Sequence, residues 1–260
     1  MNIIFYKYNG AGNDFVMLDN REEWFDWENK ELIARLCDRK FGVGADGIIL
    51  LQNHDEQAFE MFYANSDGSR GSMCGNGGRC IVAFAHQLGI IEQNQEITFM
   101  GPDAPHQGIL VSEGKVKIDM IDVKAIQEKN GLTFVSTGTP HHIQYVPNLK
   151  EFPIVTEARK LRDRCSEKDG VNVNYVEHID GQWHVRTYER GVEDETLACG
   201  TGATAVALAL AEQKGVTSPV AIHMPGGVLT ISFDYSPEQG FTNVWLEGPA
   251  TFVFEGEMEV

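Results

Sequence analysis

Short runs of alternating hydrophobic and polar residues recur along this 260-residue chain, separated by Gly, Asn and Asp. Alternation of this kind predicts β-strands, whereas apolar residues at helical spacing predict helices over 28–39, 75–88 and 203–214, with a weaker helical pattern at 156–163. The expected strands are 2–8, 14–18, 47–51, 58–64, 97–100, 115–120, 132–136, 143–146, 171–176, 183–188, 220–224, 228–233, 242–247 and 251–254. The pattern predicts an α+β (mixed α/β) fold with few helices.

A weak internal repeat divides the chain. Residues 63–65 and 74–77 (YAN, CGNG) align without a gap on residues 188–190 and 199–202 (YER, CGTG), at an offset of 199 − 74 = 125. In each copy a strand ending in Tyr precedes a Cys-Gly-x-Gly turn, and an apolar helix follows. Because repeats of this length indicate duplicated structural units, we expect two pseudo-symmetric halves, 1–116 and 117–249. The last strand, within 250–260, is expected to return to the first half.

The two Cys-Gly-x-Gly turns combine features that favour chemistry on a carboxylate. Their glycines permit a sharp turn and close approach of the backbone to a ligand. The unpaired N–H groups and partial positive charge at a helix start bind anions and favour a thiolate over a thiol. Two such helices at the interface of the halves would place Cys74 and Cys199 on opposite sides of one bound carboxylate. This arrangement suits two-base inversion at the Cα of an amino acid, without a pyridoxal cofactor or a metal.

The other three cysteines have simpler interpretations. Cys37 lies on the apolar face of a predicted helix, and Cys80 lies in the helix behind Cys74, so both are expected in the core. Cys165 is expected at the surface or at a boundary. A metal site from Cys74 and Cys80 lacks the usual ligand spacing.

Charge and composition restrict the kinds of molecule that the protein is expected to bind. Lys and Arg number 21 against 38 Asp and Glu, a net charge of −17, which disfavours nucleic acid and anionic membranes. No segment is apolar for long enough to be a signal or a membrane span. An odd number of cysteines, five, without the spacing of secreted scaffolds predicts reduced thiols in the cytoplasm. The oligomeric state stays open, with a homodimer as one candidate.

Several motifs in order resemble the diaminopimelate epimerase family, over most of the chain. They are KYNGAGNDF at 7–15, GVGADG at 42–47, NSDGS at 65–69, MCGNG at 73–77, GTPH at 138–141, YERG at 188–191 and ACGTG at 198–202.

The resemblance implies a cofactor-independent epimerase that interconverts LL- and meso-2,6-diaminopimelate, on the route to lysine and to peptidoglycan precursors. It also implies two halves, each a curved mixed sheet around a central helix. Cys74 would be the proton donor and Cys199 the acceptor, with His141 and Glu189 tuning their pKa values. The substrate-binding residues would be Asn13, Asn65, Gly75, Asn76, Thr139, Asn172, Glu189, Arg190, Gly200 and Thr201.

Individual side chains suit the far end of such a substrate. Arg190 offers a planar fork of donors to the distal carboxylate, and Glu189 can accept the distal ammonium. Three features depart from the family pattern. Thr139 stands where many members have Asn, Gly47 stands where some have Gln, and the segment 190–196 is one residue longer than in some relatives.

Two other functions stay open. One is a proline racemase or hydroxyproline epimerase of the same fold, although those proteins typically carry His at the position of Asn76. The other is a thiol redox sensor or an amino-acid-binding protein in which Cys74 and Cys199 form a disulfide. We expect such a disulfide to be an inactive, oxidised form.

Overall fold

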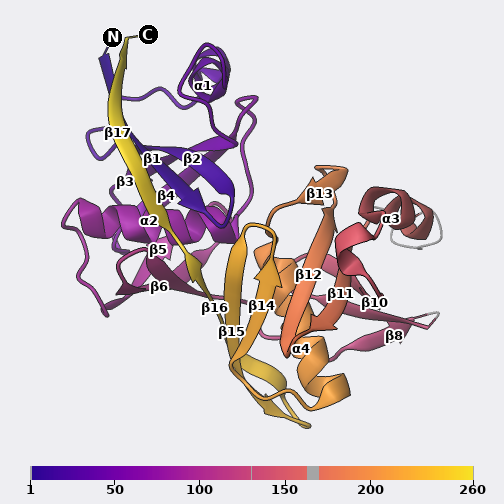
Figure 1. Ribbon diagram of the computed structural model, residues 1–260. Coiled ribbons are helices and arrows are strands. Elements are labelled where there is room, and N and C mark those ends of the chain that lie inside the picture. Colours follow the sequence, from indigo (N-terminus) through magenta and orange to yellow (C-terminus); the bar gives the residue numbers. More distant parts are fainter. Residues whose placement is uncertain (1, 130, 163–169, 260) are drawn as a thin grey trace. The chain divides into compact units, whose positions relative to one another are not determined.

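The computed structural model describes residues 2–129, 131–162 and 170–259 (Figure 1). The predicted Cys165 and the end of the predicted helix 156–163 lie outside these residues. The chain divides into two compact units, Met1–Ile118 with Gly248–Val260, and Asp119–Glu247. We call them unit 1 and unit 2 and describe each by itself.

Unit 1 is a mixed sheet with two helices. Its strands hydrogen-bond in the order β17-β1-β2-β3-β4-β5-β6-β7, with β2–β3 and β4–β5 parallel and the other pairs antiparallel. The C-terminal strand β17 thus pairs with β1 along its length, as Figure 1 shows. The elements are β1 (Asn2–Gly10), β2 (Asn13–Asp19), α1 (Lys30–Cys37), β3 (Gly47–Gln52), β4 (Glu60–Asn65), α2 (Gly75–Gln87), β5 (Glu96–Met100), β6 (Pro105–Ser112), β7 (Lys115–Asp119) and β17 (Thr251–Glu259).

Unit 2 repeats this topology. Its strands follow the order β8-β9-β10-β11-β12-β14-β15-β16, again with the third and fifth pairs parallel and the others antiparallel. The short β13 adds to β12. The elements are β8 (Gln127–Lys129), β9 (Leu132–Ser136), β10 (Pro140–Tyr145), η1 (Leu149–Glu151), α3 (Ile154–Arg162), β11 (Asn172–Ile179), β12 (Gln182–Glu189), β13 (Asp194–Thr196), α4 (Gly200–Lys214), β14 (Val220–Met224), β15 (Gly227–Ser236) and β16 (Gly240–Pro249).

Each sheet wraps around one central helix. Helix α2 contacts β17, β1, β2, β3 and β6, strands from both ends of the sheet order, and α4 likewise contacts β9, β10, β11, β14 and β15. Ten consecutive residues of α2, Asn76 to Ala85, and nine of α4, Gly202 to Leu210, are buried. A helix buried all round carries mainly small and apolar residues, and both sequences do, apart from the buried polar side chains of Asn76 and Arg79 in α2 and Thr204 in α4. The predicted mixed fold of two pseudo-symmetric halves is confirmed.

Some element boundaries differ from the prediction. Helix α1 is shorter than 28–39, because the Asn29 side chain accepts a hydrogen bond from the Leu32 N–H and so caps the helix, and Asp38 is already extended. Strands β6, β8 and β13 were not predicted, since Pro105 and Gly108 obscure the alternation of β6 and the other two are only three residues long. The core positions predicted for Cys37 and Cys80 are confirmed, at 3% and 0% exposure.

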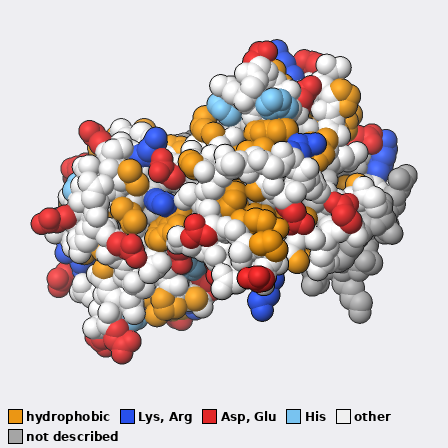
Figure 2. Space-filling model, turned by 90° about the horizontal axis from the view of Figure 1, so that it is seen from below, with side chains coloured by type: hydrophobic (Ala, Val, Ile, Leu, Met, Phe, Trp, Pro, Cys, Tyr) orange, Lys and Arg blue, Asp and Glu red, His pale blue; other side chains and the backbone are white. Residues whose placement is uncertain are grey.

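On the face that Figure 2 shows, acidic side chains are scattered rather than gathered in one patch. The face in Figure 2 shows red acidic groups interspersed with fewer blue basic ones. No helix in the described part of the chain is long and apolar enough to cross a membrane.

Candidate functional site

The two cysteines of the repeat occupy the same local geometry. Cys74 immediately precedes α2 with φ −119° and ψ 117°, and Cys199 precedes α4 with φ −120° and ψ 109°. Each carbonyl accepts the first helical hydrogen bond, from Gly78 N–H at 2.8 Å and from Ala203 N–H at 2.9 Å. Neither thiol caps its helix, and both are thiols rather than parts of a disulfide. Each sulfur therefore lies beside the positive end of a helix dipole.

In unit 1, the Asn13 amide faces Cys74. Asn13 Oδ1 accepts from Cys74 Sγ at 3.6 Å and from Asn76 Nδ2 at 3.4 Å. Asn13 Nδ2 donates to Asp46 Oδ2 at 2.7 Å. Because a carboxylate can only accept, Asp46 determines which end of the amide points to the thiol. The predicted Asn13 and Asn76 thus lie together with Cys74.

An ion cluster holds Asp46 in place. Arg39 bridges Asp14 and Asp46, both at 2.7 Å, and Lys7 pairs with Asp14 at 2.7 Å. Burial raises the pKa of Asp14, but hydrogen bonds and charge interactions with Arg39 and Lys7 outweigh it and hold that pKa well below its usual range. The cluster was not predicted from the sequence, although Asp14 and Asp46 both lie in the motifs that carry the family resemblance.

Arg79 is a buried cation one turn into α2. It is 0% exposed and donates to Asn76 Oδ1 at 2.7 Å, Gly75 O at 3.1 Å and Pro249 O at 3.2 Å. Burial lowers the pKa of Arg79, and its charge interactions with Cys80 and Cys74 oppose this. Arg79 thus fixes the Asn76 amide and the first turn of the helix. Arg79 was not predicted to be a site residue, because an arginine within an apolar helical pattern is expected to be exposed.

Asn65 and Gly47 lie opposite each other in the β3–β4 pair. Asn65 Nδ2 donates to Ser69 Oγ at 3.0 Å, which orients the predicted binding amide. A Cβ at Gly47 would lie 2.6 Å from both Ala64 O and Tyr63 Cε2, closer than van der Waals contact permits. A side chain at Gly47 would therefore require Tyr63 and its strand to shift.

In unit 2, a threonine hydroxyl lies beside Cys199. Thr201 Oγ1 lies 3.4 Å from Cys199 Sγ and 3.3 Å from Thr139 Oγ1. Thr139 Oγ1 is in turn 2.9 Å from His141 Nε2. Asn172 Nδ2 also donates to Thr139 Oγ1, at 3.2 Å. The predicted residues Thr139, His141, Asn172 and Thr201 therefore form one connected hydrogen-bond group with Cys199.

His141 is fully buried beneath this group. Burial, and then the positive charge of Arg190, lower its pKa to about 3, so the imidazole is neutral near pH 7. Asn174 Nδ2 lies 3.1 Å from His141 Nδ1. Asn174 was not predicted, although strand alternation puts it on the same face of β11 as Asn172.

Glu189 is the last residue of β12, and Arg190 follows it beside this group. Glu189 Oε2 accepts from Thr196 Oγ1 at 2.8 Å. Burial raises the pKa of Glu189, and the Thr196 hydrogen bond offsets only part of this. The Arg190 backbone N–H donates to Asn172 Oδ1 at 2.8 Å, which connects the predicted distal-end residues to the predicted amide.

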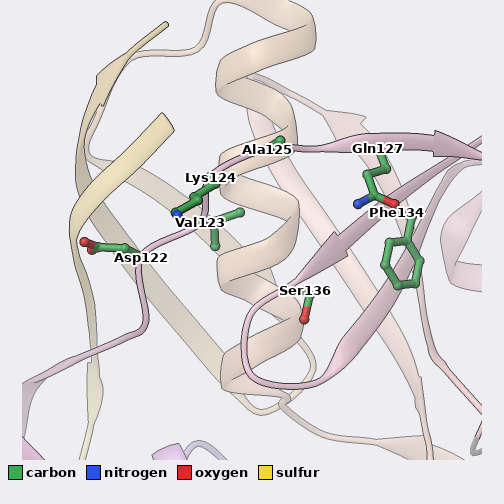
Figure 3. A pocket seen from close by; sticks show the side chains of 7 residues that line it. All are labelled: Asp122, Val123, Lys124, Ala125, Gln127, Phe134 and Ser136. Carbon is green, nitrogen blue, oxygen red and sulfur yellow. The ribbon is translucent and has the colours of Figure 1, made fainter. Parts of the chain in front are cut away.

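A separate cavity in unit 2 has a volume of about 220 Å³. It lies between the segment before β8 and strands β8 and β9 (Figure 3), and none of its lining residues is a predicted site residue. The lining residues are Asp122, Val123, Lys124, Ala125, Gln127, Phe134 and Ser136.

Structural comparison defines the class of fold. A PhzF-family phenazine biosynthesis protein from Bacillus anthracis matches with a TM-score of 0.73 at 14% identity, covering 100% of both chains. A probable proline racemase from Agrobacterium radiobacter matches with a TM-score of 0.68 at 13% identity, covering 99% of this chain and 92% of the other. The chain thus has the duplicated α/β fold of these proteins.

Sequence comparison specifies the family. The family profile described as diaminopimelate epimerase matches residues 5–124 and 133–253. A diaminopimelate epimerase from Flavobacterium psychrophilum is 46% identical over 253 residues, covering 96% of this chain and 98% of the relative. The chain belongs to the diaminopimelate epimerase family, and it is an isomerase of the epimerase type.

Proposed function

We propose that this protein interconverts LL- and meso-2,6-diaminopimelate by two-base proton exchange, with Cys199 and Cys74 as the two bases. The observation that carries the proposal is the matched position of the two thiols at the starts of α2 and α4. Family membership supports the choice of substrate.

The proposed reaction removes one proton and adds another at the same Cα. In the LL-to-meso direction, the Cys199 thiolate takes the Cα proton and the Cys74 thiol delivers a proton to the opposite face. The substrate carboxylate accepts hydrogen bonds from the backbone N–H groups of Gly75-Asn76 and Gly200-Thr201. These groups stabilise the negative charge that develops on the carboxylate as the proton leaves. In the reverse direction the cysteines exchange roles.

We propose that selectivity for diaminopimelate comes from binding the amino-acid group at the end of the substrate that does not react. Arg190 would bind the distal carboxylate through its planar donors, and Glu189 would accept the distal ammonium. Asn65 and Asn13 would add neutral hydrogen bonds. Reduced thiols are required, so the proposal places the reaction in the cytoplasm, where it would supply lysine and peptidoglycan synthesis.

Deuterium exchange tests the proposal. We expect the purified protein in deuterated water to convert LL-diaminopimelate to the meso form with solvent deuterium at one α-carbon, followed by NMR. Free proline serves as the control substrate and should not exchange. Exchange of proline without exchange of diaminopimelate would instead assign a proline racemase. Binding of diaminopimelate without any exchange would point to a binding protein.

A further inference from the structure

A buried polar pair underlies the Cys199 hydrogen-bond group in unit 2. Asn174 and Thr187 are both 0% exposed, and Thr187 Oγ1 donates to Asn174 Oδ1 at 2.9 Å. Asn174 Nδ2 donates to the His142 carbonyl at 3.1 Å. A backbone carbonyl can only accept, so the nitrogen end of the Asn174 amide must face β10. This contact fixes the amide orientation without reference to the histidine.

The amide in turn fixes the tautomer of His141. Asn174 Nδ2 also lies 3.1 Å from His141 Nδ1, so Nδ1 accepts a hydrogen bond and carries no proton. A neutral imidazole has a single N–H, which must then be on Nε2. That N–H points at Thr139 Oγ1, 2.9 Å away.

The direction of donation continues from Thr139 to the sulfur. Asn172 is oriented because its Oδ1 accepts from the Arg190 backbone N–H at 2.8 Å, so its Nδ2 donates to Thr139 Oγ1. Thr139 Oγ1 thus accepts two hydrogen bonds, and its own proton is left to donate to Thr201 Oγ1 at 3.3 Å. Thr201 then has its proton available for Cys199 Sγ at 3.4 Å.

We infer that Asn174 is a positioning residue that sets the His141 tautomer and thereby directs an O–H donor onto the Cys199 sulfur. Donation to sulfur stabilises the thiolate, the form that a proton acceptor needs. The inference deepens the proposed function and rests on it for the role of Cys199. The device depends on the hydroxyl of Thr139.

Neighbouring titratable groups agree with this arrangement. The Arg190 charge disfavours a second proton on His141. His142, the next residue in β10, turns its ring to Phe134 with 5.4 Å between ring centroids. Glu189 is engaged with Thr196 at 2.8 Å.

The tautomer can be observed directly in the unsubstituted protein. We expect long-range ¹⁵N–¹H NMR spectra of histidine-labelled protein to show His141 neutral with its proton on Nε2 throughout pH 5 to 8. The resonance is assigned from the His141→Gln variant. A proton on Nδ1 would overturn the inference. No substrate is present, so the result is independent of whether the proposed epimerase activity is found.

The link to sulfur is tested with Asn174→Asp. A carboxylate can only accept, so His141 Nδ1 must then carry a proton. Burial and the Arg190 charge disfavour a second proton on the ring, so Nε2 becomes an acceptor and no longer donates to Thr139. We expect alkylation of Cys199 by iodoacetamide at pH 7 to slow about fivefold, the effect of one hydrogen bond. The assay uses a Cys74→Ser background and locates the modified peptide by mass spectrometry.

A double-mutant cycle distinguishes an effect through the hydrogen bonds from His141 to Cys199 from a direct effect of the new aspartate charge on the sulfur. In a Thr139→Val background the link between His141 and Thr201 is broken, so Asn174→Asp should cause no further slowing. Equal slowing in both backgrounds would show that the new charge acts through space, and would refute the inference. If Asn174→Asp does not fold, the NMR measurement of the His141 tautomer in the unsubstituted protein still tests the inference.

Discussion

Arg79 and Thr204 occupy the same position in the two halves, since 204 − 79 = 125. Each donates to the carbonyl of the glycine four residues earlier, Arg79 to Gly75 O at 3.1 Å and Thr204 to Gly200 O at 3.0 Å. The backbone role is the same, yet one side chain is a buried cation and the other is neutral. Among the described residues no carboxylate forms an ion pair with Arg79. Duplication has therefore kept the geometry of the helix start while its electrostatics diverged.

The same divergence extends to the groups that meet each sulfur. In unit 1 an ion cluster orients the Asn13 amide, whose oxygen accepts from Cys74. In unit 2 a neutral buried network ends at the Thr201 hydroxyl beside Cys199. An acceptor favours a thiol, whereas a donor favours a thiolate. Matched backbones can thus carry two opposite protonation states, which a two-base reaction requires.

The cysteines provide the largest expected effect. Cys74→Ala and Cys199→Ala should each lower epimerisation by about 10³-fold, the usual range for loss of a general acid or base. The two variants should differ in what they retain. With Cys74 gone, Cys199 can still exchange the Cα proton of the LL isomer without inversion, and with Cys199 gone, Cys74 can still exchange the D centre of the meso isomer.

Mass spectrometry of each isomer in deuterated water measures this crossed pattern. Equal exchange of both isomers by both variants would mean that the two thiols are interchangeable. Near-normal epimerisation by either variant would contradict the two-base mechanism altogether.

Acid should destabilise the two units in different pH ranges. An unfolded histidine titrates near 6.5, while the pKa of folded His141 is lowered to about 3. The unfolded state therefore binds the proton more readily, so the stability that His141 contributes is present above about pH 6.5 and is lost as the pH falls. The expected change is about 100-fold in the unfolding constant of unit 2 over two pH units. The lowered pKa of Asp14 acts only below about pH 4.

Hydrogen exchange of β10 and β11, compared with β1 and β2, measures this difference between pH 7 and pH 4. His141→Gln should remove the early loss in unit 2. The raised pKa of Glu189 works in the opposite sense, because its folded state binds the proton more readily. Earlier loss of protection in β1 and β2 would contradict the prediction.

The Arg79–Thr204 difference should be visible in thiol reactivity. Burial lowers the pKa of Arg79, and its charge interaction with Cys74 offsets part of this, so the guanidinium reciprocally favours the Cys74 thiolate. Arg79→Met should slow alkylation of Cys74 by about tenfold, because the positive charge that favours the thiolate is lost. Thr204→Val should leave Cys199 unchanged, because its hydroxyl bonds only a backbone carbonyl. Arg79→Lys keeps the charge and should restore most of the rate; an equally slow lysine variant would show that shape, not charge, matters.

The comparison of the two halves shows which features the sequence alone could predict. The 125-residue offset and the glycines were sufficient to predict two matched helix starts, since turn chemistry is local. The partners of each sulfur were only partly predictable. Asn174 and Thr187 meet because β11 pairs with β12 in one particular register, and a polar residue on a buried strand does not reveal its partner. Arg79 was missed because an apolar helical pattern predicts burial only for apolar side chains.

The smallest effect concerns which end of the Asn13 amide faces Cys74. In Asp46→Asn the new amide can donate to Asn13 Oδ1, so Asn13 can turn its nitrogen to the sulfur. Alkylation of Cys74 should then accelerate about fivefold, as expected for exchanging one hydrogen bond. Asp14→Asn is the matched control, because it removes the same charge from the same Arg39 cluster but leaves the bond from Asn13 to Asp46 intact. An equal acceleration in both variants would assign the effect to net charge. It would then no longer support the view that a hydrogen-bond acceptor at Cys74 favours the thiol.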